Sequence, residues 1–272
     1  MDYTFSALNG DTVAMAPREA MQFGRALQRV CSTIVHSDRR FGPVKMAKID
    51  IADGFYHVWV QLADVPKLGV ALPSTPGCLP LVAFPLALPM GWMESPPSFT
   101  TLTETACDLA NAHLSNPSSG RLRLPHRLEA VAATPPSDAA PHPVATTTRR
   151  ATTVRGALPT RTPVAAVDMY VDDFLLLAQT KRQQQRVMRA ALISIDDVFR
   201  PLQPGDPVHR KEPSSTKKML KGDACWRSQK RILGWDMDSE ALTLNLPPHR
   251  IYRLREVISW LRPPRKRLAV AK

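Results

Sequence analysis

The stretch Met169-Tyr170-Val171-Asp172-Asp173-Phe174-Leu175-Leu176-Leu177 places two neighbouring acids between two short apolar runs. Each run is about four residues long and rich in β-formers, which predicts two buried strands. Short polar side chains tolerate turn geometry, so Asp172-Asp173 is expected at the turn of a hairpin. Two carboxylates on one tight turn repel each other unless a cation joins them, and Mg²⁺ prefers such oxygen ligands. Taken alone, the pair also fits an ordinary polar hairpin turn.

Two stretches earlier in the chain extend this pattern. Lys48–Val60 looks like a buried strand that ends in an acid: Asp50 follows an apolar lead-in, and the aromatic Phe55 comes five residues later. In Leu88–Phe99, a Pro-Met-Gly-Trp turn precedes Ser95-Pro96-Pro97, which is typical of a helix start with Ser at the cap.

In this order, the three stretches resemble motifs A, B and C of the reverse transcriptase family: Asp50 to Phe55, Leu-Pro-x-Gly-Trp followed by Ser-Pro, and Tyr-x-Asp-Asp. The resemblance is strongest to polymerases of retroviruses and LTR retrotransposons, and it covers most of residues 17–113 and 167–261. It implies an α+β fold, a polymerase palm whose antiparallel sheet packs on helices, with truncated fingers and a disordered insertion. It also implies an RNA-directed DNA polymerase, a nucleotidyltransferase that uses dNTPs and an RNA or DNA template with a primer.

The resemblance assigns roles to the matching positions. Asp50, Asp172 and Asp173 would hold two Mg²⁺ ions, with Mn²⁺ as a substitute, and these ions would stabilise the attacking and leaving oxygens of phosphoryl transfer. Phe55 would stack below the sugar of the incoming nucleotide and select deoxynucleotides; a plain core aromatic is the alternative. The other nucleotide-binding positions implied are Ile51, Asp53, Gly54, Met90 and Gly91. Retroviral enzymes usually carry Gln at the position of Met90, so no hydrogen bond from that side chain is expected.

Two further motifs are expected after the acidic pair. Lys217, Lys218 and Lys221 form a basic cluster, and Lys221 is the candidate for the family's lysine that protonates the leaving pyrophosphate. A solvated lysine run is the alternative reading of this cluster. Residues 231–244 have a hairpin pattern that resembles the primer grip, with Leu233, Gly234 and Trp235 as its residues. Helical patterns are predicted at 17–36, 95–113, 180–199 and 247–261.

Residues 115–166 differ from the rest, because Pro, Ala, Ser, Thr and Arg dominate without periodicity. Such a segment buries too little apolar surface to offset the entropy lost on ordering, so we expect a disordered insertion. An artefact of the gene prediction, such as an unspliced intron, is the alternative. The expected domains are a fingers remnant with its first helix (1–46), the first palm part with motifs A and B (47–114), the insertion (115–166), the second palm part with motifs C, D and E (167–246), and a helix with a basic tail where a thumb begins (247–272).

The composition narrows the function classes. A formal net charge of +12 over 272 residues favours a polyanionic partner, with nucleic acid first. The four cysteines are scattered without a CxxC pair, which argues against a structural zinc site and a secreted disulfide framework. The sequence contains neither a long apolar run nor a signal pattern, so an intracellular protein, cytoplasmic or nuclear, without a membrane partner is expected.

The position of Asp50 bears on activity. Only 49 residues precede it, so the fingers, which in the family usually carry the basic clamp for the triphosphate, are expected to be incomplete. Three hypotheses follow: an active reverse transcriptase core, an inactive retroelement remnant that still binds nucleic acid, and a passive basic nucleic-acid-binding protein. Protein partners are not indicated by the sequence.

Overall fold

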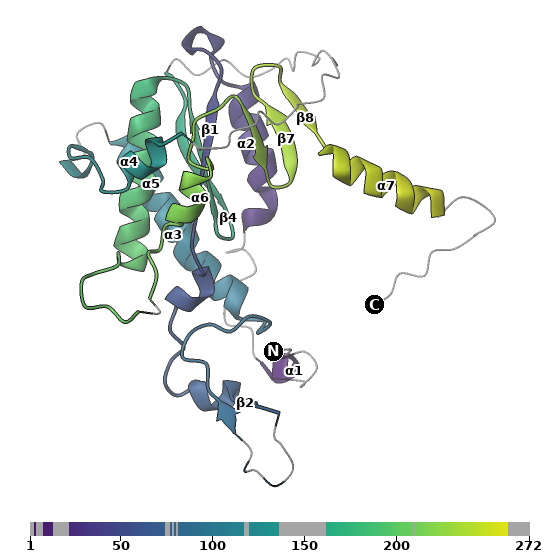
Figure 1. Cartoon of the computed structure of the whole chain (residues 1–272). Coiled ribbons are helices and arrows are strands. Elements are labelled where there is room, and N and C mark those ends of the chain that lie inside the picture. Colours follow the sequence, from purple (N-terminus) through teal and green to yellow (C-terminus); the bar gives the residue numbers. More distant parts are fainter. Residues whose placement is uncertain are drawn as a thin grey trace.

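A three-stranded antiparallel sheet, in the order β1-β5-β4, forms the centre of the fold (Figure 1). The computed structural model describes residues 3, 8–12, 22–73, 77, 79, 81–116, 120–135, 162–208 and 210–260. In it, β1 spans Lys45–Asp50, β4 spans Ala165–Tyr170 and β5 spans Asp173–Ala178. The hairpin predicted around the acidic pair is confirmed, but its turn is Val171-Asp172, because Asp173 pairs with Tyr170 as the first residue of β5.

The central strand β5 is buried on both of its faces. Phe174, Leu176 and Ala178 belong to one apolar cluster, and Leu175 and Leu177 belong to a second cluster on the opposite face. Successive side chains of a strand point to opposite faces, so a strand covered on both sides needs apolar residues at every position. This explains the continuous apolar run that follows the acidic pair in the sequence.

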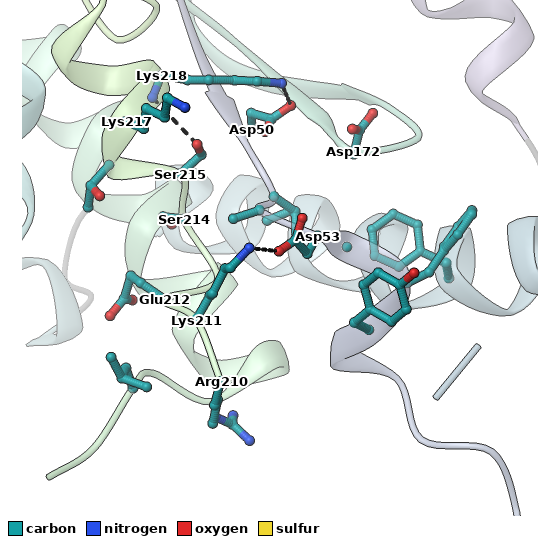
Figure 2. A pocket seen from close by; sticks show the side chains of 18 of the residues that line it. Asp50, Asp53, Asp172, Arg210, Lys211, Glu212, Ser214, Ser215, Lys217 and Lys218 are labelled. Carbon is teal, nitrogen blue, oxygen red and sulfur yellow. Dashed lines mark hydrogen bonds and ion pairs between the residues drawn. The ribbon is translucent and has the colours of Figure 1, made fainter. Parts of the chain in front are cut away.

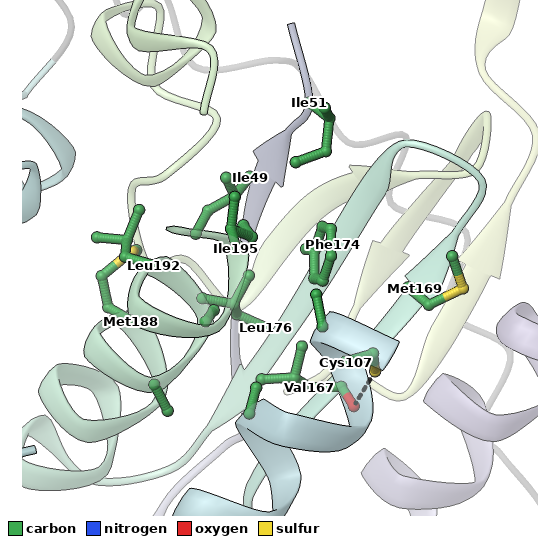
Figure 3. Close-up of a cluster of buried hydrophobic side chains, with 14 of the residues drawn as sticks. Ile49, Ile51, Cys107, Val167, Met169, Phe174, Leu176, Met188, Leu192 and Ile195 are labelled. Carbon is green, nitrogen blue, oxygen red and sulfur yellow. Dashed lines mark hydrogen bonds between the residues drawn. The ribbon is translucent and has the colours of Figure 1, made fainter. Parts of the chain in front are cut away.

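Two long helices cover the first face, α3 at Ser95–Ser115 and α5 at Lys181–Phe199 (Figures 1 and 3). The predicted cap of α5 is confirmed, because the Thr180 side chain accepts a hydrogen bond from the backbone N–H of Gln183. The predicted cap of α3 is wrong by one residue. Ser95 is the first helical residue, and its hydroxyl instead donates to the carbonyl of Pro89 at 2.7 Å.

The second face is covered by α2 and by a small antiparallel sheet. α2 spans Ala26–Val35 after a 3₁₀ turn at Gln22–Arg25, and the predicted helix residues 17–21 lie outside the described part of the chain. The small sheet, in the order β6-β7-β8, consists of Gln229–Ile232, Trp235–Asp238 and Thr243–Asn245, so the predicted hairpin gains a third strand. The cluster that joins these elements to the central sheet contains Val30, Ile34, Met46, Ile232 and Met237.

The outer edge of β1 is closed by residues 213–227. The backbone N–H groups of Met46 and Lys48 donate to the carbonyls of Arg227 and Asp223, each at 2.8 Å. A short helix within this segment, α6 at Thr216–Leu220, buries Met219 at 1% exposure in the main core. Backbone groups of an edge strand are satisfied in this way, and the segment is fixed against the end of β1 that carries Asp50.

Residues 120–135 are ordered and packed, which corrects the expectation of a disordered insertion over 115–166. They contain a 3₁₀ turn at Gly120–Leu122 and the helix α4 at Glu129–Ala133. Leu128 and Ala132 belong to the main core, and Glu129 accepts from Arg189 of α5 at 2.6 Å. Composition misled the prediction here because two apolar residues and a paired charge suffice for docking onto an existing helix. Residues 136–161 lie outside the described residues.

The remaining elements are short or peripheral. They are α1 (Leu8–Asp11), β2 (Val70–Ala71), β3 (Val82–Ala83), α7 (Pro248–Trp260) and the 3₁₀ turns Arg39–Phe41, Gly54–His57 and Val65–Leu68. The predicted strand that ends in an acid is confirmed, because β1 ends at Asp50, and beyond it the chain turns through Asp53 at φ +51°. The predicted helix α7 is present but buries no residue. Within the described ranges, no helix has the length and apolar character needed to cross a membrane.

The packing of residues 120–135 can be tested by truncating one side chain. Replacing the buried Leu128 with alanine should lower the free energy of unfolding by about 2–3 kcal/mol, because the transfer energy is lost and a cavity is left. The matched control is Leu124→Ala in the same segment, where the side chain is 77% exposed and stability should stay unchanged. Denaturant unfolding measures both. Equal stability of the two variants would show that this segment does not belong to the core.

The ion pairs of the same segment predict acid sensitivity. Burial acts to raise the pKa of Asp196, but hydrogen bonds from His126 and Arg127 outweigh it and hold the pKa below its usual 3.8. A carboxylate whose pKa is lower in the folded state than in the unfolded state contributes stability at pH values above its unfolded pKa. This contribution is lost as the pH falls through its folded pKa. Asp196→Asn should therefore reduce the loss of stability below about pH 4, as measured by melting temperature.

Candidate active site

The register of the central sheet brings the three predicted metal ligands together. Asp50, the last residue of β1, lies directly opposite Asp173 of β5, and the N–H of Ile51 donates to the carbonyl of Asp172 at 3.0 Å. The predicted convergence of Asp50 with the acidic pair is thus confirmed. The turn between them is strained, because Val171 has φ +56°, a region that β-branched residues rarely adopt.

Two lysines lie among these carboxylates. The Nζ of Lys218 is 2.5 Å from Oδ1 of Asp50, whose side chain is only 6% exposed (Figure 2). The Nζ of Lys48 lies 3.7 Å from Asp173 and 3.6 Å from Asp223. Lys48 lies two positions before Asp50 on β1, so both side chains project from the same side of the strand. That spacing was a signal in the sequence that Lys48 belongs to the site.

The lysines compensate the acids only in part. Burial raises the pKa of Asp50, the charges of Asp172 and Asp173 add to this, and the hydrogen bond and charge of Lys218 offset part of it. Burial likewise raises the pKa of Asp173, against the opposing charge of Lys48. Carboxylates held with a raised pKa disfavour their charged form, so an additional cation at this point would be stabilising.

A cavity of about 830 Å³ opens beside the acids, and most predicted nucleotide-binding residues line it (Figure 2). The predicted residues in its lining are Asp50, Ile51, Asp53, Gly54, Phe55, Met90 and Asp172. Asp173 and Gly91 do not line it, although Asp173 is paired with Asp50. The opposite wall is basic, with Arg210, Lys211, Lys217 and Lys218, and an ion pair between Lys211 and Asp53 joins the two walls.

Phe55 and Gly54 also have packing roles. The ring of Phe55 meets that of Phe99 edge-on, with centroids 5.1 Å apart and an interplanar angle of 87°. A Cβ on Gly54 would stand 2.5 Å from the Phe99 ring, so only glycine permits this approach. Phe55 therefore lies between the apolar core and the cavity, which fits both of the roles considered from the sequence.

The structure separates other predicted residues from the cavity. Lys221 ends α6 and is exposed outside the cavity lining, so Lys218 is the lysine that reaches the acids. Choosing between them requires the orientation of α6, which the spacing of the lysines does not reveal. Leu233 and Gly234 form the β6–β7 turn with positive φ, and Trp235 begins β7. None of the three lines the cavity.

The three carboxylates have the oxygen donors that a divalent cation needs, although the ammonium groups of two lysines lie among them. Asp50, Asp172 and Asp173 offer only carboxylate oxygens, which suit Mg²⁺. Across the described part of the chain, however, no group of three His, Cys, Asp or Glu side chains stands close enough to hold a metal ion. The ammonium of Lys218 contacts Oδ1 of Asp50, so its positive charge opposes that of a metal ion at the same carboxylate.

Comparisons with known proteins find one kind of similarity. No protein-family model matches the chain, and no curated protein matches it. Among solved structures it is similar to a foamy viral protease-reverse transcriptase in complex with an RNA/DNA hybrid, with a TM-score of 0.43 and 13% sequence identity. The alignment covers 85% of this chain and 22% of that chain.

The partly compensated acids predict a gain of stability when one is neutralised. Asp173→Asn should increase the free energy of unfolding by about 1 kcal/mol in metal-free buffer, which raises the melting temperature by about 2–4 °C. Lys48 keeps its second partner, Asp223, in this variant. The control is Asp64→Asn, which removes an exposed pair with Lys67 and should change little. A lower melting temperature for Asp173→Asn would show that its pairing with Lys48 outweighs its burial.

Proposed function

We propose that the chain carries the palm of a reverse transcriptase of the retrovirus or LTR-retrotransposon type. The reaction would be template-directed DNA synthesis from dNTPs by phosphoryl transfer. The observation that carries this proposal is the convergence of Asp50, Asp172 and Asp173 at the rim of a large cavity with a basic wall. These residues come from segments more than a hundred positions apart, and an ordinary hairpin turn has no need of a third acid.

Asp50, Asp172 and Asp173 would hold two Mg²⁺ ions. Bound there, such ions would stabilise the negative charge that develops on the attacking and leaving oxygens. The chain itself fixes the positions of the acids, because β1 and β5 pair in one register and are held by the two cores. Rigid placement of charge is the main contribution that a protein makes to phosphoryl transfer.

The cavity would receive the incoming nucleotide. Phe55, supported from behind by Phe99, would offer its ring to the sugar, while Met90 lines the cavity without an amide group. Arg210, Lys211 and Lys217 would attract the triphosphate from the opposite wall. Lys211 is paired with Asp53, so an entering phosphate would exchange for that carboxylate.

A primer and template would bind through phosphate contacts. The formal net charge of +12 supports this partner, and such binding weakens steeply as salt increases. The residues that would grip the primer, Leu233, Gly234 and Trp235, lie on the β6–β7 turn and the start of β7, and their role is part of this proposal.

A second candidate is a protein that binds nucleic acid without catalysis. The specific observation in its favour is the ion pair between Lys218 and Asp50, together with the absence of a ready three-residue metal group among the described residues. The basic surface alone would serve this function, as it would in a passive binder unrelated to polymerases.

Primer extension distinguishes these functions. With a labelled primer on an RNA template and Mg²⁺ or Mn²⁺, we expect slow extension by the wild-type chain and none by Asp50→Asn or Asp172→Asn. Loss of a metal ligand removes stabilisation that operates in the transition state, so rates should fall by at least about 10³-fold. Fluorescence anisotropy should show that both variants still bind the primer–template.

The control for this experiment is Asp64→Asn, an exposed acid outside the cavity, which should extend like the wild type. Primer extension by both Asp50→Asn and Asp172→Asn would contradict the proposed reaction. Salt-dependent binding of nucleic acid without extension by the wild type, under either metal, would favour the second candidate.

A further inference from the structure

Lys218 contacts the carboxylate that would hold a metal ion in the proposed function. Its Nζ is 2.5 Å from Oδ1 of Asp50, within the cavity that also exposes Asp172 (Figure 2). The ammonium uses one acceptor site of that oxygen and places a positive charge beside it. The contact therefore opposes the approach of a divalent cation to the same carboxylate.

The backbone holds Lys218 in this position. The N–H of Ser215 donates to the carbonyl of Asp50 at 2.8 Å, and the Ser215 side chain caps α6 by accepting from the N–H of Lys218. One residue further along, Met219 is buried in the main core. The helix that carries the lysine is thus tied to the strand that carries the acid.

The two lysines of the site differ in their freedom to leave. The side chain of Lys218 is 49% exposed, so it can swing into solvent from its anchored helix. The side chain of Lys48 is 17% exposed and is placed between two acids, Asp173 and Asp223. Lys218, the cation paired with Asp50, can therefore exchange, whereas Lys48, the cation beside Asp173, is largely buried and stays in place.

We propose that Lys218 is a resident cation that competes with divalent metal for Asp50, so that each metal-binding event at this acid releases the lysine. This inference rests on the proposed function, since it assigns the metal to the same acids. It makes Lys218 a positioning residue that sets the metal concentration at which the site fills. By linkage, metal binding weakens the ion pair between Lys218 and Asp50 by the same factor by which that ion pair weakens metal binding.

Metal binding by the full chain, without nucleic acid, tests the competition. Mn²⁺ is titrated into the protein at pH 7.5, and free Mn²⁺ is counted by electron paramagnetic resonance. Removing the competing charge-assisted hydrogen bond in Lys218→Gln should tighten the apparent Kd about tenfold. Lys218→Arg keeps the cation and should bind as weakly as the wild type.

The chain offers a matched control in Lys217, which is adjacent on α6 and lines the same cavity. Lys217→Gln removes the same charge from the same wall without touching the ion pair, so its Kd for Mn²⁺ should stay within about twofold of the wild type. Equal tightening in both variants would overturn the proposal in favour of a general electrostatic effect. Unchanged binding in Lys218→Gln would overturn it outright.

A second measurement uses the wild-type protein and does not depend on a variant folding. Lysine acetylation is followed by mass spectrometry with and without Mn²⁺, and labelling of Lys218 should accelerate with metal while that of Lys217 stays constant. Equal acceleration, or none, would contradict the release of Lys218.

The outcomes separate this inference from the proposed function. If Mn²⁺ binding is lost in Asp50→Asn but is insensitive to Lys218→Gln, the competition is wrong while the metal site stands. If Lys218→Gln tightens Mn²⁺ binding but no variant extends a primer, the competition stands while the proposed reaction fails.

Discussion

The pairing of β1 with β5 is the constraint on which the site depends. One register places the apolar residues of both strands in the two cores and at the same time sets Asp50 opposite Asp173. A slip by one residue would move every side chain of β1 to the wrong face, so the core enforces the alignment of the acids. The energy of apolar burial thereby holds together carboxylates that would otherwise repel each other.

The sequence was informative where a short pattern had only one structural solution. The apolar run after Asp173 had to be a doubly covered strand, and the periodicity from Met188 to Phe199 had to be a helix with one buried face. The acids could be identified from their settings at the ends of apolar runs. Their distance in space could be predicted only through a resemblance to known enzymes, because no local signal connects Asp50 to the hairpin.

The sequence was misleading where tertiary contacts decide. Residues 120–135 have the composition of a disordered segment, yet α5 offers them an apolar surface and an arginine. Lys218 and Lys221 are equivalent in the sequence, and only the anchoring of α6 by Ser215 selects the first.

The closure of β1 by residues 213–227 on one side and by β5 on the other has a consequence for biosynthesis. Both neighbours of this strand lie more than a hundred positions later in the chain, so a growing polypeptide displays β1 without partners until β5 has also left the ribosome. Contacts of such sequence separation form slowly, because a long loop must close before they are gained. The strand that carries Asp50 is therefore synthesised long before it acquires its native neighbours.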